Sequence, residues 1–247
     1  MKAKPLFFVG LHKPQFAAQF ERCMVSINVL EKRRSDFAVH KWLLDSGAFT
    51  RISTGCGHMP IKDYAGQIER WSRCGELEAA VAQDYMCEPF ILVKTGMTIE
   101  EHQRLTIANY TELRALVRSD IYIMPVLQGY EPQEYVAHIL MYGELLSPSM
   151  WVGVGSICKR NSNPSAIEAV LLAIKTRRPD LQLHGFGLKK TALRSPIVNL
   201  LLKSSDSAGW SYAERMKGGD ANGPLGAHRY VNAVRDMPIQ MRLEMQE

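Results

Sequence analysis

Two aspartates follow apolar runs in similar surroundings and could act together on a glycosidic bond. Asp206 lies in KSSDSAGWS (203–211) after the run IVNLLL, and Asp45 lies in WLLDSGAFT (42–50). Two carboxylates on opposite parts of one site suit this cleavage, because one attacks or stabilises the anomeric carbon while the other transfers protons. Each aspartate could alternatively cap the helix that follows it.

A third carboxylate and an amide could recognise a purine. Asp84 ends the run AAVAQD (79–84), and Gln128 precedes Gly129 at the end of IYIMPVLQG (121–129). A carboxylate accepts hydrogen bonds from N1–H and the 2-amino group of guanine, and an amide donates to O6. The set therefore indicates a base pocket rather than a sugar pocket. Gln128 and Gly129 could instead form only a turn.

Aromatic residues and glycines near these positions fit a flat ligand. Phe49, just past Asp45, could stack on an extruded base, and Tyr85 and Phe186 are further candidates. Glycines at strand ends leave room for the backbone to approach a ligand: Gly47, Gly153, Gly155, Gly185 and Gly187. Phe49 could instead belong to the core, and His184 could be an interior histidine.

A sheet must position these residues, because each follows a short apolar run. Eight such runs alternate with helix-like segments: 6–10, 23–27, 42–46, 79–84, 121–129, 151–156, 181–187 and 200–206. Runs that are apolar throughout suit parallel strands buried on both faces, and eight alternations predict a (β/α)8 TIM barrel. A doubly wound open sheet is the alternative. In both folds the carboxyl ends of the strands form the functional rim.

Two of the helix-like segments carry clear signals at their starts. Apolar residues recur at three- and four-residue spacing in 97–118 and 164–177. Thr98 and Glu101 have the spacing of a capping box, and Asn163 followed by proline predicts an N-cap.

The chain divides at one loop-rich segment, KGGDANGPLG (217–226). We expect the catalytic barrel to occupy residues 1–216. Residues 217–247 should form a loop and a C-terminal helix that packs on the barrel.

Composition predicts an ordinary globular protein of the cytoplasm without a membrane segment. The chain has 247 residues, of which 46% are hydrophobic and 22% charged. Its apolar runs are far shorter than the ~20 residues that span a bilayer. Five scattered cysteines without a C-x-x-C pair indicate free thiols. We expect no metal site, because Cys56 and His58 form the only local pair of metal-binding type.

The ordered motifs resemble those of the DpdA-like deazapurine DNA-modification proteins, which are relatives of the tRNA-guanine transglycosylases. They are LLDSGAF, AQDYMCEP, PVLQGY, VGVGSICKR, LHGFGLK and SSDS, and the similarity runs from about residue 6 to 211. The resemblance implies base exchange on a (β/α)8 barrel through a covalent glycosyl-enzyme. Guanine in a nucleic acid would be replaced by a 7-deazaguanine such as 7-cyano-7-deazaguanine (preQ0), without a cofactor.

The resemblance also implies a role for each motif residue. Asp206 would be the nucleophile and Asp45 the general acid/base. The substrate-binding residues would be Ser46 and Gly47 beside Asp45, Asp84, Gln128 and Gly129 at the guanine edge, Gly153 and Gly155 as backbone donors, and Phe49 and His184 as the stacking pair.

One departure from the tRNA enzymes favours DNA as the partner. Those enzymes end in a C-x-C-x-x-C…H zinc site, whereas no cysteine follows Cys158 here. We therefore expect a compact barrel without the zinc-binding subdomain, acting on a flipped or single-stranded guanine in DNA with a free 7-deazaguanine base. The alternatives are the same exchange on tRNA and a non-catalytic nucleic-acid-binding barrel.

Charge distribution also suits a polyanionic partner, with a net charge of +5. Seven cations follow predicted strand ends and are expected on the rim: Lys32, Arg33, Arg34, Lys159, Arg160, Lys189 and Lys190. Arg177 and Arg178 end a helix and are expected on the opposite face. Each cluster could also be ordinary solvated surface.

Overall fold

The computed structural model describes residues 4–160 and 162–238, which form a nearly closed β/α barrel. Nine strands in these ranges pair only in parallel, in the order β5-β4-β3-β2-β1-β9-β8-β7-β6. They are β1 (Leu6–Leu11), β2 (Arg22–Ser26), β3 (Lys41–Asp45), β4 (Glu76–Val81), β5 (Ile123–Met124), β6 (Val126–Leu127), β7 (Trp151–Val154), β8 (Gln182–Gly185) and β9 (Leu202–Ser207). The TIM-barrel prediction is confirmed.

Pro125 divides the fifth predicted strand into two. β5 pairs with β4, whereas β6 pairs with β7. Proline has no amide hydrogen to donate and interrupts a regular ladder. The two ends of the sheet therefore meet within one short run of the chain, and the run at 121–129 supplies both.

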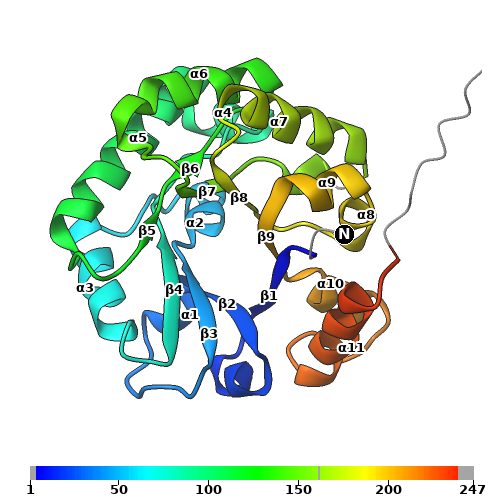
Figure 1. Ribbon diagram of the computed structural model, residues 1–247. Helices are drawn as coiled ribbons and strands as arrows, with labels where there is room; N and C mark the ends of the chain where they lie inside the picture. The colour runs from blue at the N-terminus through cyan, green and yellow to red at the C-terminus, as the bar shows by residue number, and fades with distance from the viewer. Residues whose placement is uncertain (1–3, 161, 239–247) are drawn as a thin grey trace, which may run out of the picture.

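Helices surround the sheet on its outer side (Figure 1). The α-helices are α1 (Ile27–Leu30), α2 (Ala48–Thr54), α3 (Ile61–Trp71), α4 (Pro89–Thr95), α5 (Ile99–Leu116), α6 (Pro132–Tyr142), α7 (Pro164–Arg177), α8 (Lys190–Leu193), α9 (Pro196–Leu201), α10 (Gly209–Met216) and α11 (Pro224–Arg235). Short 3-10 helices are η1 (Pro14–Gln19), η2 (Gly143–Leu145) and η3 (Cys158–Arg160). Within the described ranges, none of these helices is long and apolar enough to cross a membrane.

The predicted helix starts are confirmed, and one predicted strand begins later than expected. Thr98 and Glu101 form the capping box of α5, and the Asn163 side chain caps α7. The run IVNLLL is helical as far as Leu201, because Ser195 caps α9 by accepting from the Val198 amide at 3.1 Å. β9 starts at the next residue.

Two apolar layers explain why the strands are apolar throughout. Phe8, Leu43 and Trp151 belong to a cluster inside the barrel. Their strand neighbours Val9 and Trp42 belong to the larger cluster between the sheet and the helices. Successive side chains of a strand point to opposite faces, so both faces of each strand are buried.

The C-terminal helix α11 packs against β1 and α10. It lies within the predicted segment 217–247, of which residues 239–247 fall outside the described ranges.

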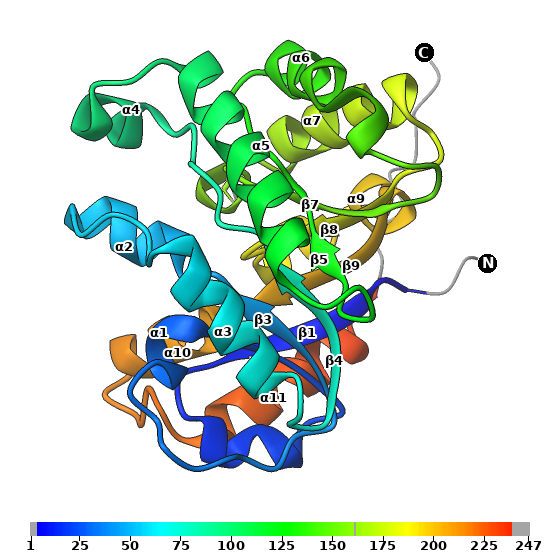
Figure 2. The same ribbon diagram turned by 90° about the vertical axis from the view of Figure 1, so that its left-hand side faces the viewer.

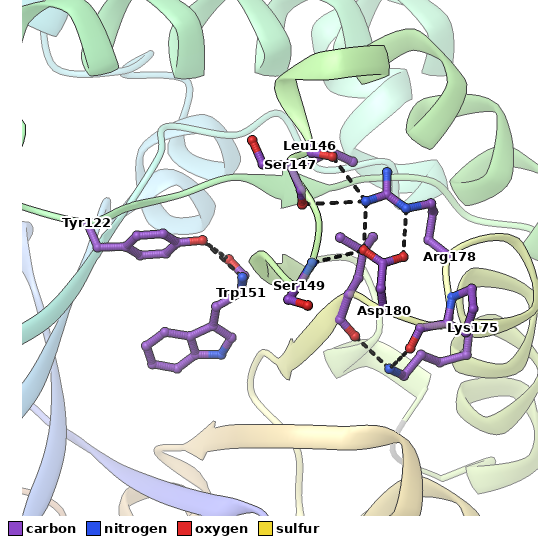
Figure 3. Close-up of polar contacts among 10 residues, drawn as sticks. Tyr122, Leu146, Ser147, Ser149, Trp151, Lys175, Arg178 and Asp180 are labelled. Atoms are coloured by element: carbon purple, nitrogen blue, oxygen red, sulfur yellow. Dashed lines mark hydrogen bonds and ion pairs between the residues drawn. The ribbon is translucent and has the colours of Figure 1, made fainter.

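Arg178 lies at the end of the barrel where the strands begin, as expected (Figure 3). Its guanidinium donates to both carboxylate oxygens of Asp180 at 2.8 Å and to the Leu146 carbonyl at 3.1 Å. Asp180 also accepts from the Ser149 amide at 3.0 Å, just before β7. These hydrogen bonds hold the pKa of Asp180 well below its usual range.

Candidate active site

A cavity of about 560 Å³ lies at the carboxyl ends of the strands. Asp45 at the end of β3 and Asp206 in β9 line it, together with Asp84 beyond β4 and Gln128 beyond β6. These four polar side chains thus surround one space. Helices α2 and α4 stand out at this end of the barrel (Figure 2).

Asp206 is held in place by one of its two oxygens. Its Oδ1 accepts from the Gly187 amide at 2.9 Å and lies 3.2 Å from Nε2 of His184. The other ring nitrogen of His184 lies 2.9 Å from Oγ of Ser204. This arrangement fixes the carboxylate and leaves Oδ2 as the oxygen available to a ligand.

Asp45 is placed by a tight turn after β3. Its Oδ2 accepts from the Gly47 amide at 3.1 Å, and the Ser26 hydroxyl also donates to the carboxylate. Burial, together with the charge of Asp206, raises the pKa of Asp45. A carboxyl whose pKa is raised in this way is suited to accept and return a proton.

Gly47 permits that turn because it has no side chain. Its φ is +70°, and a Cβ atom here would lie 2.3 Å from the amide nitrogen of Asn28. The Asn28 amide donates to the Gly47 carbonyl at 3.1 Å. Asn28 in turn accepts from Arg51 at 2.8 Å, so α1 and α2 together hold the turn.

Asp84 and Gln128 form a hydrogen-bonded pair on the cavity wall. Nε2 of Gln128 donates to Oδ2 of Asp84. Burial raises the pKa of Asp84 to about 7. Gly155 makes room for the pair, because a Cβ atom at this position would lie 2.1 Å from Nε2 of Gln128.

The structure adds Ser156 and Glu88 to this wall, neither of which was predicted as a site residue. The Ser156 hydroxyl lies 2.7 Å from Oε1 of Gln128 and 3.0 Å from Oε2 of Glu88. Ser156 has a φ of +54°, which is uncommon for a residue other than glycine. Nothing in the sequence after the Gly-rich strand predicts this conformation of Ser156. Glu88-Pro89 likewise resembles the ordinary start of a loop or helix.

Aromatic side chains stand at the mouth and on the wall of the cavity. Phe49 lines the cavity and is 37% exposed, so it is accessible to a ligand. Nζ of Lys159 lies 4.6 Å from the centre of the Phe49 ring and 5.9 Å from that of Phe90. Phe186 also lines the cavity, and its ring occupies the space next to Gly153.

Five of the predicted substrate-binding residues do not line the cavity: Ser46, Gly47, Gly129, Gly153 and His184. His184 is fully buried beneath Asp206, and Ser46 is also buried. Gly129 allows close packing on α6, because a Cβ atom there would lie 3.0 Å from the Tyr135 amide. The candidate stacking residue Tyr85 is likewise absent from the wall and packs on the His58 ring.

The predicted cations do not all gather at the mouth. Lys159 lies there over Phe49, and the neighbouring Arg160 donates to the Tyr130 carbonyl. Arg33 turns away, because its guanidinium donates to the carbonyls of Ser35 and Asp36.

Arg34 and the cations after β8 also occupy different surroundings. The Arg34 carbonyl accepts from Arg70 in the last turn of α3, away from the rim. Lys189 lies over the Tyr212 ring of α10, and Lys190 lies over the Tyr230 ring of α11. Lys32 follows Glu31, whose carboxylate pairs with Arg51 of α2 at 2.7 Å.

The described ranges contain no group of three or more His, Cys, Asp or Glu side chains placed to hold a metal ion. Comparison with models of protein families identifies a match over most of the chain. The model of the family described as "DpdA: DeoxyPurine in DNA protein A" matches residues 3–242. No curated protein matches the chain.

Proposed function

Because this chain belongs to the DpdA family, we propose that it is a pentosyltransferase that exchanges guanine in DNA for a 7-deazaguanine base. The description of the family associates it with deoxypurines in DNA. The observation that carries the proposal is the convergence of two catalytic-type aspartates and a base-reading pair, Asp84 and Gln128, on one cavity.

The Asp84–Gln128 pair suits the hydrogen-bonding edge of guanine. Oδ2 of Asp84 accepts from Gln128, which leaves Oδ1 to accept from N1–H or the 2-amino group of the base. Nε2 of Gln128 has a second hydrogen that can be donated to O6. Phe49 and Phe186 supply aromatic surface for the faces of the ring.

The first half of the reaction uses both aspartates. Oδ2 of Asp206 attacks C1′ of the deoxynucleotide, and the C1′–N9 bond breaks as a glycosyl ester forms. The electron pair of that bond leaves with guanine, which takes a proton from Asp45. The raised pKa of Asp45 supports this donor role.

The second half reverses these steps with a different base. The 7-deazaguanine enters the vacated pocket and gives its N9 proton to the Asp45 carboxylate. N9 then attacks C1′, and the bond to Asp206 breaks. Protons balance over the cycle, because Asp45 gives one and receives one.

DNA must reach the cavity with the target nucleotide outside the helical stack, because C1′ is shielded within a duplex. Lys159 at the mouth supports a path for the phosphate backbone past Phe49.

The experiment that tests the proposal measures incorporation of a labelled 7-deazaguanine into DNA. We expect the unmodified protein to incorporate the label and Asp206→Ala to abolish incorporation while the protein stays folded. A covalent protein–DNA adduct should persist on a denaturing gel only when Asp206 is present. Incorporation into tRNA but not DNA, in a parallel assay, would overturn the proposed partner, and no incorporation into either would overturn the activity.

A further inference from the structure

Four polar side chains form one continuous hydrogen-bonded row along the cavity wall. The row runs from Asp84 to Gln128, then to Ser156, and ends at Glu88. Glu88 is 1% exposed and lines the cavity, yet its Oε1 has no hydrogen-bond partner among the described residues. A buried carboxyl that is only half satisfied calls for a physical explanation.

The number of protons in the row decides the state of Glu88. The Ser156 hydroxyl has one hydrogen but faces two oxygens, Oε1 of Gln128 at 2.7 Å and Oε2 of Glu88 at 3.0 Å. It already accepts from the Cys87 amide at 2.9 Å. If Glu88 were ionised, the single hydroxyl hydrogen of Ser156 could lie toward only one of these two oxygens. The other oxygen–oxygen contact would then contain no proton.

A proton on Oε2 of Glu88 completes every contact in the row. Glu88 then donates to Ser156, Ser156 donates to Oε1 of Gln128, and Nε2 of Gln128 donates to Asp84. Burial, the largest influence, raises the pKa of Glu88. Hydrogen bonds from its own backbone amide and from Ser156 oppose this shift, as do the nearby cations Lys159 and Arg160.

The alternative placement of the proton reverses the Gln128 amide. If Asp84 held the proton, it would donate to Oε1 of Gln128, and Nε2 would donate to Ser156 beside an ionised Glu88. The cavity would then present an oxygen instead of an N–H group at the position for O6. Such a wall suits a purine with a 6-amino group and not guanine.

We propose that, at pH values where Asp84 is ionised, Glu88 holds the proton of this carboxyl pair and, through Ser156, keeps the Gln128 nitrogen turned toward Asp84, so that the pocket selects a 6-oxo over a 6-amino purine. This inference rests on the proposed function, because it concerns how the same pocket chooses its base. Glu88 is a positioning residue, since it acts through Ser156 and Gln128.

The test compares the binding of two free bases, 7-deazaguanine and 2,6-diamino-7-deazapurine, by titration calorimetry. The unmodified protein should prefer 7-deazaguanine by at least about tenfold, a difference of about 1.4 kcal/mol. Glu88→Gln should keep this preference, because its amide N–H donates to Ser156 as the protonated acid does. Glu88→Ala should lower the ratio about tenfold or more. The control is Glu112→Gln on the exposed face of α5, which should change nothing.

Two binding results would overturn the inference: loss of the preference in Glu88→Gln, which would mean that an ionised carboxylate is needed, or an unchanged ratio in Glu88→Ala. Infrared difference spectra give a second measurement without a ligand. The carbonyl band of a protonated carboxyl should be present in the unmodified protein and in Glu112→Gln and diminished in Glu88→Gln. An unchanged band would refute the assignment. A protein that shows the band but binds neither base would count against the proposed function and not against the location of the proton.

Discussion

The His184 ring lies beneath Asp206, with its Nε2 atom 3.2 Å from Oδ1 of the carboxylate. The ring is fully buried, and its edge contacts with Phe8 and Trp151 hold it inside the barrel. His184 therefore supports the carboxylate from below, in a different place from the base-stacking position that the family resemblance implies.

We expect His184→Phe to slow exchange about 10- to 100-fold, because a hydrogen bond to a charged group contributes about 1.5–3 kcal/mol. The substitution keeps a buried ring and removes both of its polar contacts. Binding of the free base should be nearly unchanged, since the Asp84–Gln128 pair is intact. Single-turnover kinetics and base titration measure the two effects. An unchanged rate in a folded variant would show that Asp206 needs no support from His184.

Guanine binding should depend on pH through Asp84, whose pKa is raised by burial to about 7. The carboxylate must be ionised to accept from N1–H, so affinity should fall about tenfold for each pH unit below 7. Asp84→Asn should bind weakly at every pH and lack this dependence. Titrations between pH 5 and pH 9, a range of about four units around that pKa, measure both curves. A parallel pH dependence in Asp84→Asn would assign the titration to another group.

Ionised Asp84 should also lower the free energy of unfolding of the ligand-free protein at high pH. Its folded pKa lies above the ordinary aspartate value of about 3.9, so the native state binds the extra proton. Stability therefore falls as pH rises from that ordinary value to about 7. At pH above this window, Asp84→Asn should be more stable by on the order of 2 kcal/mol in denaturant unfolding. A less stable variant would contradict the raised pKa.

A methyl group at position 155 should disrupt base recognition. Gly155→Ala would place Cβ 2.1 Å from Nε2 of Gln128 and force the amide to move. We expect base affinity to fall at least tenfold, a loss of about 1.4 kcal/mol. The matched control is Gly66→Ala in α3, where a Cβ atom meets nothing within 4 Å. That control should keep full affinity and gain up to about 1 kcal/mol of stability, because alanine favours helix. Equal affinity in both variants would exclude a role for the Gln128 position.

Charge reversal at the mouth should weaken DNA binding. We expect Lys159→Glu with Arg160→Glu to reduce affinity and to lower the slope of log K against log salt by about 1 for each phosphate that the protein no longer neutralises. Arg177→Glu provides a control on the opposite face of the barrel, and it should leave the slope unchanged. Binding measured at several salt concentrations distinguishes them. The double substitution changes the net charge twice as much as Arg177→Glu does, so an effect of Arg177→Glu half as large as that of the double substitution would indicate a dependence on net charge alone.

The barrel and the four converging side chains could be predicted from the sequence, because parallel strands carry a direct signal. Each run is apolar throughout, and a polar residue such as Asp45 or Gln128 marks the end that faces the cavity. Once a barrel is assumed, all such ends meet at one rim. The order of the motifs along the chain was therefore enough to bring distant residues together.

Contacts that depend on local backbone geometry could not be predicted in the same way. Ser156 has a left-handed backbone conformation, and its hydroxyl contacts Glu88, which lies 68 positions away in the sequence. No sequence motif predicts either feature. The positions of the cations were difficult to predict for the same reason. Arg33 follows a strand end, yet its guanidinium donates to the backbone carbonyls of Ser35 and Asp36 in its own loop. Position after a strand specifies the neighbourhood of a residue but not the direction of its side chain.

Because of the break at Pro125, the two edges of the sheet, β5 and β6, are joined by the chain itself and not by ladder hydrogen bonds. The proposed base-reading pair lies on both sides of this break. Asp84 follows β4 and Gln128 follows β6, so their hydrogen bond links the two edges of the sheet where regular ladder pairing is interrupted. A guanine bound by both residues would add a second link between these edges. Binding of the base and closure of the sheet at this break would then stabilise each other.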